Sequence, residues 1–194
     1  MTPTFHPNRL DDPLKVKKPS RIFVGSSGDL WGKFIPTDWI HQILEIVKKC
    51  PQHTFQFLTK NPSRYVEFNF PDNCWIGTTI DTQARADANL DDFKKAEAEI
   101  KFISFEPLLE EINVDLRGID WIIIGGCTGD NKDLPTYPNK LWVNKLRSQC
   151  LLLDIPIFIK NNAGLKNISK DFPKEKKLLV EKDEFKKSDL RRFT

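Results

Sequence analysis

The sequence predicts an α/β protein: a partial, TIM-barrel-like β/α barrel with about six parallel strands. Six short apolar runs, each ended by a polar or charged residue, have the Val-, Ile- and Phe-rich content of buried parallel strands. Segments with helical spacing alternate with these runs, which is typical of βαβ units. Six strands are too few for a closed eight-stranded barrel. Their irregular spacing along the chain favours a partial barrel over a regular doubly wound sheet.

The predicted strands share one property, a polar residue at the downstream end. In chain order they cover residues 21–25, 54–60, 75–80, 102–106, 121–126 and 156–160. The carboxyl ends of parallel strands meet on one face of a sheet or barrel, where ligands bind. The sequence therefore predicts a site built from the residues that close these runs.

Helices are predicted between the strands. Apolar residues recur at helical spacing over 39–47, and Thr37 is placed to cap the start of this helix. The segment 61–66 indicates a turn into a short helix. The later part of 81–99 and the segment 138–153 complete the predicted helices.

The composition is that of an ordinary soluble domain. The chain has 194 residues, of which 39% are hydrophobic and 29% charged, with a net charge of +3. No apolar run approaches the roughly 18 residues that a membrane span needs. The first residues also lack the apolar stretch of a secretory signal. We therefore expect a cytoplasmic protein without a membrane partner, with a barrel domain over residues 1–165 and a charged extension over residues 166–194.

The extension contains KEKK, FKK and DLRR clusters. Such a segment is either a solvated, partly helical or disordered tail, or an extension that binds nucleic acid or a protein partner. The net charge alone does not indicate nucleic-acid binding.

The four cysteines form no CxxC or CxH motif, so no zinc site is predicted, and disulfides are not expected in a cytoplasmic chain. Cys127 is distinctive because it follows Gly125-Gly126 at the end of a predicted strand. It either fills a tight turn or acts as a nucleophile or ligand.

The loop after the first strand is Gly25-Ser26-Ser27-Gly28-Asp29. It matches neither a dinucleotide fingerprint nor a phosphate loop. It is either a tight turn or an anion cradle made of backbone amides and two hydroxyls. Trp31, just past this loop, could line a pocket and stack on a base.

Three charged residues that end predicted strands, Lys60, Glu106 and Lys160, are expected to project near the barrel mouth, with Asp29, Thr79 and Asp81 close by. A Lys–Glu–Lys cluster can satisfy its own charges, bind an anion or a cofactor carboxylate, or support Schiff-base chemistry. The candidate cofactor-binding residues are Ser26, Ser27, Asp29, Lys60, Thr79, Glu106, Cys127 and Lys160. No catalytic residue is assigned.

An ordered set of motifs spans roughly residues 5–162. They are HPNRLDDPLKVKKP, RIFVGSSGDLW, TFQFLTKNPSR, CWIGTTID, FISFEPLL and WIIIGG, together with a downstream Pro-bearing strand that ends in Lys. As a set they resemble the phage-type three-cysteine-motif proteins, which look like a distant branch of the radical S-adenosylmethionine barrel enzymes. The resemblance implies a partial β/α barrel, an iron–sulfur cluster held by three N-terminal cysteines, and S-adenosylmethionine as cofactor.

The chain departs from this family pattern at the cluster. No cysteine precedes Cys50 and no CxxC occurs, so we expect no iron–sulfur cluster from this chain alone. Position 127 is usually acidic in the family, and the Lys160–Gly164 segment replaces a pattern with Gln and Trp. S-adenosylmethionine remains the expected cofactor.

The sequence supports two function hypotheses. The first is a radical-S-adenosylmethionine-like barrel protein of phage or mobile-element type, without cluster-dependent activity as an isolated chain. The second is a non-catalytic nucleotide- or nucleic-acid-binding module that uses the barrel mouth and the basic tail. The expected partner is a missing N-terminal segment or partner chain, or a second copy paired through an exposed sheet edge. Nucleic acid is a further candidate partner.

Overall fold

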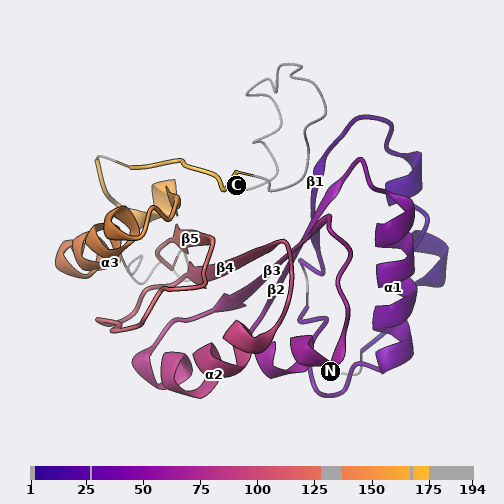
Figure 1. Ribbon diagram of the computed structural model, residues 1–194, viewed down its shortest axis with the longest axis horizontal. Coiled ribbons are helices and arrows are strands. Elements are labelled where there is room, and N and C mark those ends of the chain that lie inside the picture. The colour runs from indigo at the N-terminus through magenta and orange to yellow at the C-terminus, as the bar shows by residue number, and fades with distance from the viewer. Residues whose placement is uncertain (1–2, 27, 128–136, 167, 175–194) are drawn as a thin grey trace.

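The structure is a computed structural model that describes residues 3–26, 28–127, 137–166 and 168–174. Six parallel strands form one sheet in the order β1-β2-β3-β4-β5-β6, curled into a half-barrel. Helices flank this sheet (Figure 1). The fold class predicted from the sequence is therefore confirmed.

The strands lie within a residue or two of the predicted positions. They are β1 (Arg21–Val24), β2 (Thr54–Thr59), β3 (Cys74–Thr79), β4 (Ile100–Phe105), β5 (Trp121–Ile124) and β6 (Ile157–Ile159). The α-helices are α1 (Thr37–Lys49), α2 (Gln83–Lys95) and α3 (Lys140–Leu152). Short 3-10 helices are η1 (Pro7–Arg9), η2 (Pro13–Lys15), η3 (Pro62–Glu67) and η4 (Asn161–Ala163).

The capping prediction for α1 is wrong. The helix begins at Thr37 itself, and Pro36 takes the cap position without a side-chain hydrogen bond. The Thr37 hydroxyl instead accepts a hydrogen bond of 3.3 Å from the buried guanidinium of Arg64 in η3.

Among the described residues, no helix combines the length and the apolar content that crossing a membrane requires.

The larger core lies between the convex face of the sheet and the helices. Side chains alternate between the two faces of each strand, so Ile76, Ile103 and Ile122 belong to this core. Trp31 is also there, fully buried, with its ring centroid 4.7 Å from that of Tyr65. The prediction that Trp31 lines a pocket is wrong, because a ring of aromatic side chains encloses it and seals it from solvent.

A second apolar cluster fills the concave face of the half-barrel. Its buried members are Trp75, Ile100, Phe102 and Trp121. The Phe102 ring lies on Gly77 of the neighbouring strand, where an added Cβ would come within 2.3 Å of ring carbons. Within the described residues, the inside of the half-barrel is therefore packed at this level, and the polar residues lie at the strand ends above it.

The segment 168–174, here named the C-terminal strap, continues the sheet beyond β6. Lys170 bridges Phe158 in antiparallel orientation, and the Ile159 amide donates to the Ser169 carbonyl at 2.8 Å. Phe172 enters the concave cluster, 5.2 Å from Trp121 between ring centroids, and the Arg21 guanidinium of β1 lies 4.4 Å from the Phe172 ring centroid. In Figure 1 the strap, drawn in yellow, runs toward the side of β1.

The strap belongs to the chain segment that the sequence predicts to be a charged extension. Residues 168–174 pack on the half-barrel instead of forming a separate tail. Residues 175–194, with most of the basic clusters, lie outside the described residues, so the two interpretations of the tail stay predictions.

Candidate functional site

The carboxyl ends of the six strands, here named the mouth, carry the polar residues that the sequence singled out. At β4 and β6, Glu106 Oε2 and Lys160 Nζ form an ion pair of 2.6 Å. The other carboxylate oxygen of Glu106 accepts a hydrogen bond of 3.2 Å from the Asn162 amide. The same amide group donates to the Gly126 carbonyl at 3.1 Å. Glu106 is thus held by two side chains from the β6–η4 corner.

Glu106 and Lys160 meet although β5 lies between their strands. The residue just past β5 that separates them is Gly125, whose backbone N–H donates to the Phe105 carbonyl at 3.1 Å. An added Cβ at Gly125 would lie 2.7 Å from Glu106 Oε1 and 3.0 Å from Asn162 Oδ1. The missing side chain therefore opens the space in which the pair forms.

A second ion cluster lies at the ends of β2 and β3. The Asp81 carboxylate accepts from Lys60 Nζ at 3.3 Å and from Arg85 Nε at 2.5 Å. Burial raises the pKa of Asp81, but the hydrogen bonds and charges of Arg85 and Lys60 outweigh burial, and the pKa lies below its ordinary value. The Asp81 side chain is well buried, whereas that of Lys60 is 54% exposed.

The expectation of a single Lys–Glu–Lys cluster is therefore wrong. Lys160 pairs with Glu106, but Lys60 pairs with Asp81. The reason is the position of Asp81, which lies just past β3, the strand next to the one that Lys60 ends. The Asp81 carboxylate is therefore one strand away from Lys60, whereas Glu106, just past β4, is two strands away.

The loop after β1 is a tight turn in which the Gly28 amide donates to the Gly25 carbonyl at 3.1 Å. Asp29 ties this loop to β2, since its carboxylate accepts from the Thr59 hydroxyl at 2.7 Å and from the Lys60 amide at 3.0 Å. Ser26 is exposed in the turn, and Ser27 lies outside the described residues. Cofactor binding by Ser26, Ser27 and Asp29 stays a prediction.

Two further candidates lie at the ends of β3 and β5, which β4 separates. Thr79 is the last residue of β3 and is buried, on the same face as Trp75. Cys127 comes shortly after β5 and is exposed. Its two interpretations, turn residue or reactive group, both remain open.

In the comparison with protein-family models, residues 1–187 match a family described as "Protein of unknown function (DUF5131)". The chain belongs to this family. The match covers the half-barrel, the strap and part of the basic clusters beyond it, so all of the mouth residues lie within the matched region. Comparisons with curated proteins and with solved structures give no match.

The cysteines of this DUF5131 protein do not fit an iron–sulfur cluster, which neighbouring thiolates must hold. Cys50, Cys74 and Cys150 are buried, and burial raises the pKa of the Cys74 and Cys150 thiols to about 12. In the described part of the chain, no three His, Cys, Asp or Glu side chains are grouped so as to hold a metal ion. No chemistry of a cluster is therefore derived for the mouth.

Sequence reasoning missed three residues at the mouth as site candidates: Arg85, Asn162 and Lys170. Arg85 lies four residues after Asp81, the spacing of ion pairs on helices, so this signal was available. Asn162 could have been noted because it comes just after Lys160 in the turn at the strand end. Lys170 carried no local signal, because only the antiparallel strap brings it to β6.

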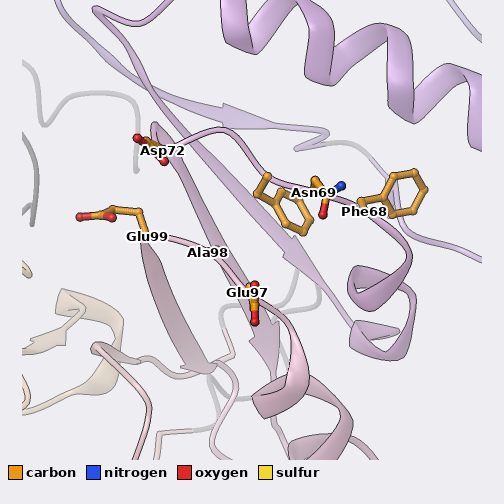
Figure 2. Close-up of a pocket in the computed structure, with 7 residues that line it drawn as sticks. Phe68, Asn69, Asp72, Glu97, Ala98 and Glu99 are labelled. Atoms are coloured by element: carbon orange, nitrogen blue, oxygen red, sulfur yellow. The ribbon is translucent and has the colours of Figure 1, made fainter.

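A pocket of about 290 Å³ lies at the opposite end of the sheet, beside the amino ends of β3 and β4 (Figure 2). It is lined by Phe68, Asn69, Phe70, Asp72, Glu97, Ala98 and Glu99. None of the predicted site residues lines it, so we assign the candidate site to the mouth.

Proposed function

We propose that this protein is a radical-S-adenosylmethionine-like barrel protein of phage or mobile-element type, and that its mouth binds S-adenosylmethionine. The ordered motifs that resemble the phage-type three-cysteine-motif proteins support the choice of cofactor. The half-barrel is the architecture that this resemblance implies. The observation that carries the proposal is the Lys160–Glu106 ion pair at the mouth.

This ion pair complements an amino-acid group. An α-amino acid holds a carboxylate and an ammonium on one carbon, so it matches a lysine and a glutamate held side by side. Lys160 and Glu106 have side chains that are 30% and 22% exposed, so a ligand can reach both from solvent. In the proposed complex, Lys160 donates to the cofactor carboxylate and Glu106 accepts from its ammonium group.

The surroundings of Glu106 fit this role. The Asn162 amide donates to Glu106 and leaves it as an acceptor. Gly125 provides the space beside it. Bound S-adenosylmethionine would supply a sulfonium group whose carbon substituents can be transferred. We propose no cluster-dependent activity for this chain alone, since its cysteines do not fit a cluster.

A second candidate function is a non-catalytic nucleotide- or nucleic-acid-binding module. It is favoured by the cluster at β2 and β3, where Lys60 and Arg85 share the single carboxylate of Asp81. Lys60 is 54% exposed, so its ammonium group has donors left for a further anion. A phosphate group is a ligand that lysine and arginine side chains of this kind bind.

One calorimetric series tests both candidates. The full chain is titrated with S-adenosylmethionine, S-adenosylhomocysteine and AMP, as wild type and as the Glu106→Gln and Lys160→Met variants. Lys48→Met is the matched control, because Lys48 forms an exposed ion pair with Glu45 on α1, outside the mouth. The proposal expects both mouth variants to weaken S-adenosylmethionine binding at least tenfold, with the control unchanged.

Two outcomes contradict the proposal. If no adenosyl ligand binds at millimolar concentration, the mouth is not a cofactor site. If AMP binds and S-adenosylmethionine does not, and Lys60→Met abolishes that binding, the second candidate is correct.

A further inference from the structure

The C-terminal strap places a third lysine at the mouth. Lys170 bridges Phe158 of β6 in antiparallel orientation. Residues directly opposite each other on paired strands project to the same face. Phe158 belongs to the concave cluster, so Lys170 extends from the concave face as well.

Packing fixes the register of the strap. The Asp171 amide donates to the Ile157 carbonyl at 3.1 Å, and the Trp121 indole donates to the Asp171 carbonyl at 2.9 Å. Phe172 contacts the Phe158 ring, with 5.4 Å between centroids. A shift of the strap by one residue would turn Phe172 out of the cluster. The position of Lys170 is therefore a defined feature of the fold.

The Lys170 ammonium group is directed toward the end of β6. It donates to the Ile159 carbonyl at 2.7 Å and lies 4.3 Å from the centroid of the Phe158 ring. An ammonium group has three donors, and Ile159 takes one. Within the described residues, no carboxylate forms an ion pair with Lys170.

The neighbouring charge is that of Lys160, the residue after Ile159. Burial, and then the charge of Lys160, lower the pKa of Lys170 below its ordinary value. Glu106 forms an ion pair with Lys160, whereas the described contacts of the Lys170 ammonium group are the Ile159 carbonyl and the Phe158 ring. Like charges held together are unfavourable unless an anion compensates them.

We propose that Lys160 and Lys170 together bind an oxyanion, the carboxylate or phosphate group of the ligand at the mouth. Lys160 retains its bond to Glu106 and contributes a remaining donor, while Lys170 contributes the second cation from the strap. The identity of the ligand rests on the proposed function, in which this oxyanion is the carboxylate of S-adenosylmethionine. The strap is then part of the binding site as well as of the sheet.

The test uses the full chain and three variants. Lys170→Met keeps the side-chain stem over Phe158 and removes the charge, whereas Lys170→Arg keeps the charge. Lys174→Met is the matched control, since Lys174 is an exposed lysine of the same strap. Calorimetry measures binding of S-adenosylmethionine, methionine and inorganic phosphate to each variant, and near-ultraviolet circular dichroism checks that the aromatic clusters are intact.

We expect Lys170→Met to weaken oxyanion binding about tenfold, which is about 1.4 kcal/mol, with Lys170→Arg and Lys174→Met close to wild type. Methionine and phosphate distinguish a carboxylate ligand from a phosphate ligand. If Lys170→Met binds all three compounds as tightly as wild type, the oxyanion site is wrong.

The two proposals can fail separately. If S-adenosylmethionine binding requires Glu106 and Lys160 but is indifferent to Lys170, the proposed function stands and the oxyanion site falls. If S-adenosylmethionine does not bind at all while phosphate binding depends on Lys160 and Lys170, the oxyanion site stands and the cofactor is wrong.

Discussion

Glu106 owes its position to a residue without a side chain. Gly125 separates it from Lys160 and lets the two charged groups meet across β5. Asp81 has the opposite effect just past β3, since its carboxylate binds Lys60 and keeps that lysine out of the Glu106 pair. At the scale of single residues, the mouth is thus divided into two ion clusters by the residues just past β3 and β5.

Gly125→Ala tests this account of Glu106. The added Cβ would lie 2.7 Å from Glu106 Oε1, so the carboxylate must move away from Lys160. We expect a loss of stability of about 1–3 kcal/mol, together with weaker S-adenosylmethionine binding. Urea unfolding and calorimetry measure the two effects. Gly28→Ala is the control, because a Cβ there meets nothing within 4 Å; equal effects of the two substitutions would contradict the account.

Asp81→Asn tests the cluster at β2 and β3. The pKa of Asp81 is lowered because Arg85 and Lys60 outweigh its burial. A lowered pKa means stabilisation that is present above the unfolded-state pKa, about 3.9, and lost as pH falls through the folded-state pKa. We expect Asp81→Asn to cost about 1–3 kcal/mol at pH 7 and to flatten the decline of stability below pH 4. An unchanged decline in urea titrations across this range would show that Asp81 does not carry the effect.

Cys127 is expected to be the reactive thiol of the folded chain. It is exposed, whereas burial raises the pKa of Cys74 and Cys150 to about 12 and also raises that of Cys50. Thiolates, not thiols, are nucleophiles. A maleimide at pH 8 should therefore label one thiol rapidly in the native protein, and Cys127→Ser should abolish this labelling. Rapid labelling of a second site in the native state would contradict the burial of the other thiols.

At the scale of elements, the sequence predicted those parts of the fold that repeat a local pattern. The six strands were found because Ile, Phe and Trp runs mark buried parallel strands. The C-terminal strap was missed because its pairing with β6 depends on Phe172 reaching Trp121, which lies far earlier in the chain. The same limit applies to the site. The sequence shows that Glu106 and Lys160 each end a strand. Their contact across Gly125 depends on the curvature of the sheet, which no local pattern reveals.

Phe172→Ala tests the contribution of the strap. The substitution removes ring contacts with Trp121 and Phe158 and the stacking of Arg21. Because Phe172 is half-buried, we expect a loss of about 1–3 kcal/mol, below that of a fully buried phenylalanine. Urea unfolding followed by tryptophan fluorescence measures the loss. Wild-type stability in this variant would mean that the strap does not hold its place in solution.

At the scale of the whole molecule, the half-barrel has two unlike edges. The strap covers β6, whereas β1 pairs only with β2 within the described residues. Phe23 of β1 is 37% exposed. An open strand edge can pair with another chain. We expect sedimentation velocity to show concentration-dependent association that Phe23→Lys reduces; a monomer at every concentration would contradict pairing between copies.

The most direct test of the account is calorimetric titration of the full chain with S-adenosylmethionine, as wild type and as Glu106→Gln. We expect the wild type to bind and the variant to bind at least tenfold more weakly, because the variant loses the carboxylate that receives the ligand's ammonium group. Equal binding by both proteins, or no binding by the wild type at millimolar ligand, would contradict a cofactor site at the mouth.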